Sequence, residues 1–397
     1  MKKRNIVLLF LLVLALAVVL VIVLKKDSSF DIAKKGITGF TTSVTNTEVV
    51  TQAEDNDEDD QPSSTDLTAV VDITDPPVDI TETEKKNTGY EYSLKGNSDG
   101  STLTLSFVGD CMFASNHGGF REGSFNKMAQ ERSPDYFLKN FQKMFGADDL
   151  TIANCEGVLS DSELTEKTVT TKIAFWFKGP SSNAKIFKAG NVELASVVNN
   201  HSHDFGQQGS DDTERSLEAV GVIPGRRDNV SYISIKGQKI GVFCCSLYSY
   251  GYLKDILVKV EEMKKNNCDL KVIYFHGGIE NATVPEEWKI SSCRELIDAG
   301  ADIIVGSHPH VLQPVEFYKG KPIVYSLGNF CFGGNTKPPR NTAVYQAVFD
   351  LEDGKRGDRR DLFTPCKVYS GEVNNYQPDI IKNEAEWNRI LGFMNVL

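Results

Sequence analysis

The sequence has no basic stripe, no internal repeat of 20–50 residues and no C-x-x-C pair. Its 54 acidic residues outnumber the 43 Lys and Arg residues, and the formal net charge is −11. Binding of nucleic acid needs clustered Lys and Arg side chains on the phosphates, so we expect no nucleic-acid partner. The lack of repeats argues against a solenoid, and the scattered cysteines argue against a cysteine-based zinc site.

The eight cysteines leave two interpretations open. An even number in an exported protein suggests disulfides. Cys111, Cys155 and Cys331, however, lie inside polar motif segments, and the adjacent Cys244 and Cys245 would point to opposite faces of a strand. We therefore expect mostly free, buried thiols.

An apolar run near the N-terminus predicts a membrane anchor. It extends from Ile6 to Leu24, after Lys2, Lys3 and Arg4. As a helix at about 1.5 Å per residue it spans roughly 28 Å, close to the hydrocarbon thickness of a bilayer. Neither an A-x-A-like cleavage site nor a nearby cysteine follows. Residues 1–26 are thus expected to be an uncleaved signal-anchor, with a cleaved signal as the alternative, and the rest of the chain is expected outside the cell.

The next segment, residues 27–100, has 17 acidic residues against five basic ones. Residues 54–60 alone contain six acids, and such a run repels itself and cannot bury a core. The composition predicts a disordered linker that joins one transmembrane helix to a domain over residues 101–380, followed by a helical tail over 381–397.

Beyond residue 100, short apolar runs alternate with helical spacing, which indicates an α/β fold. We expect helices over 136–145, 210–220, 252–264, 286–299 and 385–393, and strands over 103–108, 150–153, 192–198, 240–244, 270–275, 303–305, 315–318, 322–326 and 343–351.

Polar residues gather where five of these segments end. The five strings are Gly109-Asp110, Asn154-Cys155-Glu156, residues 199–204, residues 276–280 and Ser307-His308-Pro309-His310, and they hold all but one of the six histidines. Each string alone has a plain alternative, such as a helix cap, a turn or a core histidine. In an α/β sheet, however, ligands bind outside the carboxyl ends of the strands, so their coincidence predicts one functional site.

The residue types in these strings suggest metal chemistry. Imidazole with carboxylate and amide oxygen suits one or two ions of Mn, Fe or Zn. Two ions can polarise an ester and activate water. A His–Asp pair beside them can supply the proton for the leaving group, and His201 with Asp204 is the candidate pair.

On these strings the chain resembles the CapA family, the bacterial poly-γ-glutamate capsule synthesis proteins, which is similar to the calcineurin-like metallophosphoesterases. The resemblance covers residues 102–379 and also includes Ser326-Leu327-Gly328-Asn329-Phe330. It implies a four-layer α/β/β/α sandwich. It also implies metal ligands at Asp110, Glu156, Asn200, His276, His308 and His310, and a catalytic role for His201. Asn154, Glu280 and Asn329 belong to the matching strings, and we assign them to substrate binding.

Two positions depart from the superfamily's pattern. Met112 stands where the superfamily has a histidine ligand, and Gly277 stands where the family usually has a tryptophan. The first departure puts one metal position in doubt, and the second puts in doubt any substrate contact at that position.

Three functions remain open at this point. The first is an anchored metal-dependent hydrolase or transferase of capsule synthesis, export or attachment, acting on an anionic surface polymer or its precursor. The second is a non-catalytic assembly or polymer-binding subunit that works with other membrane subunits of capsule synthesis, as the loss at Met112 favours. The third is a phosphatase of small molecules. Retention of His201, Asp204, His308 and His310 favours catalysis.

Overall fold

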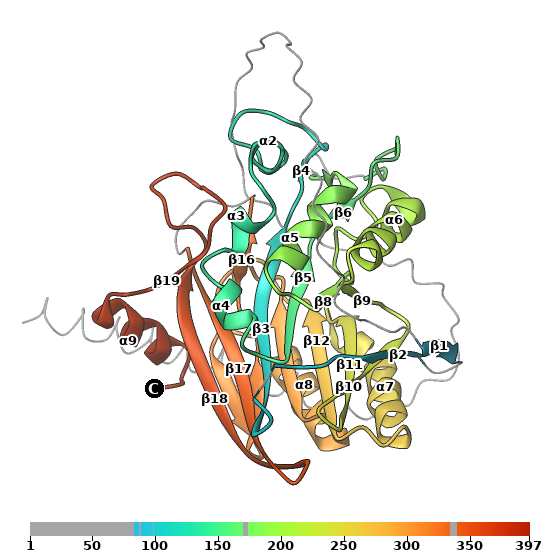
Figure 1. Ribbon diagram of the computed structural model, residues 1–397, viewed down its shortest axis with the longest axis vertical. Helices are drawn as coiled ribbons and strands as arrows, with labels where there is room; N and C mark the ends of the chain where they lie inside the picture. The colour runs from blue at the N-terminus through green and yellow to red at the C-terminus, as the bar shows by residue number, and fades with distance from the viewer. Residues whose placement is uncertain (1–82, 87–88, 98, 170–173, 334–339) are drawn as a thin grey trace, which may run out of the picture. The chain divides into compact units, whose positions relative to one another are not determined.

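Two large β-sheets dominate the computed structural model, which describes residues 83–86, 89–97, 99–169, 174–333 and 340–397 (Figure 1). The first sheet has the strand order β1-β2-β10-β11-β12-β13-β15-β14. Its strands β11, β12 and β13 are parallel neighbours. The strand bounds are Thr83–Lys86, Gly89–Ser93, Val230–Ile235, Gln238–Ser246, Leu270–His276, Ile303–Ser307, Lys321–Val324 and Val315–Tyr318, in that order.

The second sheet has the order β19-β18-β17-β3-β5-β8-β9, and β16 pairs with the end of β3. Its bounds are Asp379–Ile380, Lys355–Lys367, Asn341–Glu352, Thr102–Met112, Leu150–Cys155, Leu194–Ser196 and Ile223–Gly225, with β16 at Asn329–Phe332. A small third sheet joins β4 (Ser115–Asn116), β7 (Phe177–Gly179) and β6 (Val158–Leu159).

The main core lies between the two large sheets. Alternate residues of β3, among them Leu105 and Phe107, share this core with Val242 and Tyr274 from the first sheet. The alternation of side chains along a strand sends Val108 to the opposite face, where it contacts a second core beneath helices. Burying both faces of the strand explains its apolar sequence.

Helices cover the outer faces of both sheets. The face of the second sheet packs against α2 (Phe125–Glu131), α3 (Asp135–Leu138), α4 (Gln142–Phe145), α5 (Lys185–Ala189) and α6 (Gly206–Ala219). The first sheet packs against α7 (Leu253–Lys265) and α8 (Glu287–Ala299). Two 3-10 turns, Ser181–Ala184 and Tyr250–Tyr252, precede α5 and α7.

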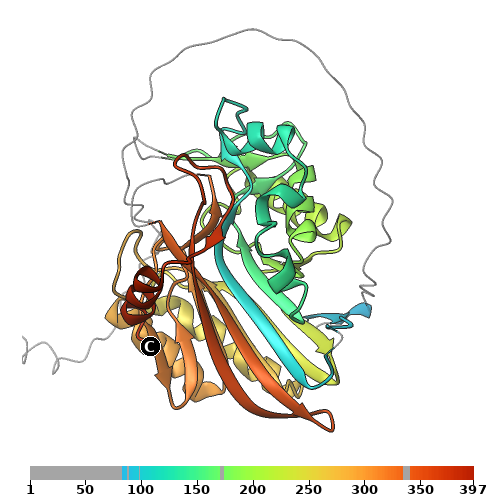
Figure 2. The same cartoon turned by 60° about the vertical axis from the view of Figure 1, so that its left-hand side comes forward.

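The expected α/β class is confirmed, and two local expectations need correction. Residues 136–145 form two short helices instead of one, and the Asn140 side chain between them donates to the carbonyl of Pro378. Strand β18 was not expected, because most of its residues are at least partly exposed and its sequence is polar. It forms a long hairpin with β17, and α9 (Glu384–Phe393) lies beside it (Figure 2).

The predicted domain boundaries at 100 and 380 also shift. Strand β2 pairs in parallel with β10, and Tyr92 and Leu94 belong to the main core, so folded structure begins before residue 101. Ile390 and Met394 of the expected tail belong to the same core. The predicted anchor and residues 27–82 of the predicted linker lie outside the described residues. Within the described ranges, no helix is both long and apolar enough to cross a bilayer.

The cysteine prediction is confirmed. All eight thiols are free and buried. Burial raises the pKa of Cys155 to about 12, for example, so these groups are unreactive thiols of the core at neutral pH.

Candidate metal centre

The carboxyl ends of strands from both large sheets deliver the candidate site. Asp110 lies near the end of β3, and Asn154 is the penultimate residue of β5. From the facing sheet, His276 is the last residue of β12, and His308 follows β13 directly. The edge at which these strands end is therefore where the predicted ligands meet, as expected for an α/β fold.

Four of the predicted ligands form one contact network. His276 Nε2 lies 2.9 Å from Asn200 Oδ1 and 3.1 Å from His308 Nδ1. Asp110 Oδ1 lies 3.5 Å from His276 Nδ1, and its Oδ2 accepts from the backbone N–H of His308 at 3.2 Å. Nitrogen and oxygen atoms of candidate metal ligands thus converge from four separate chain segments.

His310 joins this network to Glu156. Its Nδ1 lies 3.3 Å from Asp110 Oδ2, and its Nε2 lies 3.8 Å from Glu156 Oε1. One ligand atom each of Asp110, Glu156 and His310 lies within 4.8 Å of the others, which is close enough for one cation to contact all three.

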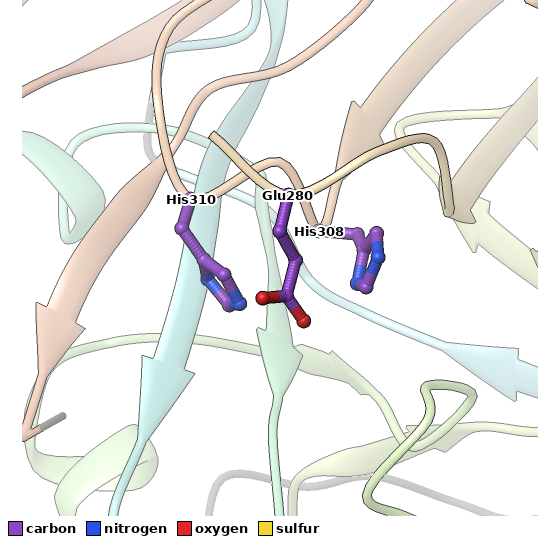
Figure 3. Close-up of side chains that lie close together, drawn as sticks. All are labelled: Glu280, His308 and His310. Atoms are coloured by element: carbon purple, nitrogen blue, oxygen red, sulfur yellow. The ribbon is translucent and has the colours of Figure 1, made fainter. Parts of the chain in front are cut away.

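Glu280, His308 and His310 form a second such group. The Glu280 carboxylate lies between the two imidazole rings (Figure 3). It comes from the loop after β12, whereas the histidines come from the loop after β13. The structure therefore brings Glu280 among the predicted ligands, although we assigned it to substrate binding from the sequence.

The buried carboxylates have opposite pKa shifts. Burial opposes ionisation of Asp110, but hydrogen bonds to His276 and His310 outweigh it and hold the pKa below its usual range. Burial, reinforced by the Asp110 charge, raises the pKa of Glu156 well above its usual value. Both Glu156 oxygens are buried without a hydrogen-bond partner among the described residues. A buried, unpartnered carboxylate is costly unless it meets a cation.

The pKa values of the histidines also shift in opposite directions. Burial lowers the pKa of His276, and burial with the charges of His276 and His310 lowers that of His308 well below its usual value. Burial also opposes the charge on His310, but Glu156 and Asp110 raise its pKa to about 10. His276 and His308 are therefore neutral at pH 7, the form in which imidazole binds a metal, whereas a cation bound to His310 would displace the proton of that ring.

The backbone of the His308-Pro309-His310 segment is not extended. His308 and His310 have φ angles of 97° and 58°. Such left-handed conformations cost on the order of 1–3 kcal/mol in non-glycine residues and cluster at functional sites. Both rings nevertheless reach the cluster, because the turn directs them inward.

The predicted His–Asp pair is formed. His201 Nδ1 lies 2.7 Å from Asp204 Oδ2, and His201 Nε2 faces Glu156 Oε1 at 3.9 Å. The same Asp204 oxygen accepts from the backbone N–H of Phe177, and Asp204 Oδ1 forms an ion pair of 2.8 Å with Lys167. Asp204 thus fixes the imidazole, whose other nitrogen points at the candidate ligands.

Asn154 and Asn329 hold other site residues. Asn154 is 0% exposed and donates to Asp110 Oδ1 at 2.8 Å. Asn329 Oδ1 lies 2.8 Å from His310 Nδ1 and fixes that ring. Their contacts are with the candidate ligands themselves.

The bacterial capsule synthesis protein family PGA_cap matches residues 104–334, more than half of the chain. The chain belongs to this family. The match spans every candidate residue from Asp110 to Asn329, so the whole centre lies within the matched range.

Two similar relatives of this family member are Bacillus proteins. The "PGA biosynthesis protein CapA" of Bacillus subtilis (strain 168) is 28% identical over 304 residues, which cover 71% of this chain and 76% of that protein. The "Capsule biosynthesis protein CapA" of Bacillus anthracis is 28% identical over 269 residues, or 62% of this chain and 63% of that protein.

A third relative is more distant. It is a "Probable polyglutamine synthesis accessory protein" of Mycobacterium tuberculosis (strain CDC 1551 / Oshkosh), 24% identical over 217 residues that cover 46% of this chain and 55% of that protein.

Two further residues of this family member contact the cluster. Ser307 Oγ lies 2.9 Å from His276 Nδ1, and the ring of Tyr248 lies 5.1 Å from that of His308. Ser307 ends β13 and belongs to one of the five polar strings, but we assigned it no role. Tyr248 follows the end of β11 by two residues and was missed, although the rule that polar groups gather at strand ends would have found it.

Proposed function

We propose that this protein is a metal-dependent hydrolase or transferase of capsule synthesis, anchored in the cell membrane with its folded domain outside the cell. The observation that carries the proposal is the orientation of His201. Its Nδ1 is held by Asp204 while its Nε2 faces Glu156 and the ligand cluster. A pure binding surface has no evident need for an oriented His–Asp pair.

The residues present fit a divalent cation. The two buried oxygens of Glu156, which have no hydrogen-bond partner among the described residues, supply the clearest sign, since a cation would relieve their desolvation. Asp110, Glu156, Asn200, His276, His308 and His310 would hold one or two ions. The mixture of imidazole nitrogen with carboxylate and amide oxygen favours Mn, Fe or Zn.

When bound, such ions polarise a phosphate ester and lower the pKa of water. The chain's own residues do the rest. Asp204 keeps the His201 ring in place and stabilises its positive charge, so that Nε2 can give a proton to the leaving oxygen. Asn154 and Asn329 hold Asp110 and His310 in the orientation that metal binding requires.

The names of the relatives suggest the polymer. Two are named for PGA or capsule biosynthesis and one for polyglutamine synthesis. We therefore propose an anionic surface polymer, or a phosphorylated precursor of it, as the substrate class. The apolar run from Ile6 to Leu24 would hold the domain near the membrane where such polymers are made and exported.

The test is turnover of the full-length chain, purified in detergent and supplied with Mn²⁺, on generic phosphodiesters and phosphomonoesters. His201→Ala should keep the metal content and lose turnover by about 10²–10⁴-fold, the usual contribution of general acid catalysis. His203→Ala is the matched control, because His203 lies in the same loop but, unlike His201, has no side-chain contact with Asp204 or Glu156 among the described residues. Equal turnover of the wild type and His201→Ala would refute the role of His201.

A second candidate is an assembly subunit that binds the polymer without converting it. Met112 favours it, because a thioether replaces the histidine that the superfamily has there. The word "accessory" in the name of the mycobacterial relative agrees with it. Stoichiometric metal binding with no turnover on either ester class would favour this function over the first.

A further inference from the structure

Position 112 offers no ligand of the type that the cluster uses. Met112 is 1% exposed and packs in a small apolar cluster with Phe332, Val368 and Tyr369. The ring of Phe332 also lies 5.0 Å from that of His310. The His310 ring therefore lies beside an apolar residue of β16, and position 112 adds no ligand atom to it.

Glu280 approaches His310 from the facing sheet. Its carboxylate lies within 4.8 Å of the ligand atoms of His308 and His310 (Figure 3). His310 also belongs to the group with Asp110 and Glu156. A cation bound to His310 is thus near carboxylates from both sheets.

The loop that carries Glu280 is built for this approach. A Cβ on Gly277 would lie 1.8 Å from the carbonyl oxygen of Leu247, and one on Gly278 would lie 2.4 Å from Lys289 Nζ. Gly278 also has a φ of 113°, which side-chain-bearing residues rarely adopt. The two glycines let the chain turn back immediately after β12.

Polar contacts then fix the loop. Glu286 accepts from the backbone N–H of Ile279 at 2.6 Å and forms an ion pair of 2.8 Å with the fully buried Lys289. On the far side of Glu280, the N–H of Asn281 donates to the carbonyl of Pro309 at 2.8 Å. This last bond ties the Glu280 loop to the turn that carries both histidines.

The negative charges around Glu280 favour a bound cation. Within the described ranges, neither Lys nor Arg comes within ion-pair distance of Asp110, Glu156 or Glu280. Three converging carboxylates therefore share only histidines as basic neighbours there.

We propose that Glu280 is a metal ligand that binds a divalent cation together with His310, replacing the ligand that Met112 does not supply. The inference rests on the metal centre of the proposed function and revises our assignment of Glu280 to substrate binding. A carboxylate from the facing sheet would thus replace the imidazole ligand that β3 lacks at position 112.

Calorimetric titration of the metal-free, full-length chain with Mn²⁺ tests this assignment, together with elemental analysis after dialysis. Glu280→Gln should lose one equivalent of Mn²⁺ or bind it at least ten times more weakly, since even an outer-shell partner is usually worth 10–100-fold in affinity. Glu280→Asp keeps the charge and should bind Mn²⁺ better than Glu280→Gln. Glu287→Gln, at an exposed glutamate of the same segment, should match the wild type.

The outcomes separate the two proposals. If the wild type binds Mn²⁺ and Glu280→Gln binds it equally in number and affinity, the ligand assignment fails while the metal centre stands. If the wild type binds no Mn²⁺, both fail. The thermal midpoint of metal-free Glu280→Gln should equal or exceed that of the wild type, because the substitution removes a repulsive charge, and this excludes misfolding as the cause of lost binding.

Discussion

At the residue scale, one carboxyl group outside the candidate metal centre shows how burial alone changes a pKa. Asp148, just before β5, is 5% exposed. One oxygen accepts from the Thr151 hydroxyl at 2.7 Å, and the other has no hydrogen-bond partner among the described residues. Burial, with a smaller contribution from the charge of Asp149, raises the pKa of Asp148 to about 7.

Asp148 predicts a pH dependence of stability. The folded-state pKa is raised above the unfolded value, so its contribution is fully present below pH 4 and is lost as the pH rises through 7. Asp148→Asn should therefore unfold like the wild type near pH 4 but be more stable at pH 8, by roughly 1–3 kcal/mol. Urea unfolding at both pH values measures this, and an equal difference at the two values would contradict the assignment.

Most site residues were predictable one by one, because a polar residue after an apolar strand is visible in the sequence. Asp110, His276 and His308 were placed in this way, and the structure brings them together. The position of Glu280 was not predictable, since it depends on how a glycine turn folds back over a neighbouring loop.

The element scale shows how one loop is held in place by a helix. Lys289 of α8 is fully buried, and its Nζ contacts Glu286 at 2.8 Å and Gln313 at 3.0 Å. Gln313 in turn donates to the carbonyl of Ala282 at 2.7 Å. These contacts connect α8 to the chain on both sides of the candidate centre.

Removing one partner of this buried pair should be strongly destabilising. Lys289→Met should lower the free energy of unfolding by roughly 3–5 kcal/mol, because Glu286 would stay buried without its cation. The double variant Lys289→Met/Glu286→Gln should recover part of that loss, since Gln can still accept from Ile279. Denaturant unfolding of both single variants and the double variant measures the coupling, and strictly additive effects would refute it.

Elements buried on two faces were easiest to predict from sequence. Strands β3, β5 and β12 are buried along nearly their whole length and were expected near their observed positions. Strand β18 was missed because hydrogen bonding to β17, and not burial, keeps it in the sheet. Strand β2 was missed because its five residues follow an acidic segment that resembles a linker.

At the scale of the whole molecule, the candidate site lies where strands of the two large sheets end. The residue at which the folded chain begins decides which N-terminal truncations keep the fold. Strand β2 pairs with β10 along five residues, and both Tyr92 and Leu94 are 6% exposed. Burial of each such side chain contributes about 1.5–3 kcal/mol. The first sheet therefore depends on residues that precede residue 95.

Two N-terminal truncations should behave differently. Deleting residues 1–26 should release the protein from membranes and leave its thermal midpoint unchanged. Deleting residues 1–94 should also release it but lower the midpoint by several degrees or prevent folding, because β2 is lost. Fractionation and thermal unfolding of the two products test both points. Equal midpoints would show that β2 is dispensable, and membrane association without residues 1–26 would refute the anchor.

The metal content of the full-length chain, measured by elemental analysis, tests the central claim most directly. The wild type should hold one or two equivalents of Mn, Fe or Zn. The double variant His308→Ala/His310→Ala should hold close to none while its circular dichroism spectrum stays that of the wild type. A wild type without metal, or a double variant with unchanged metal content, would contradict the assignment of this cluster as a metal centre.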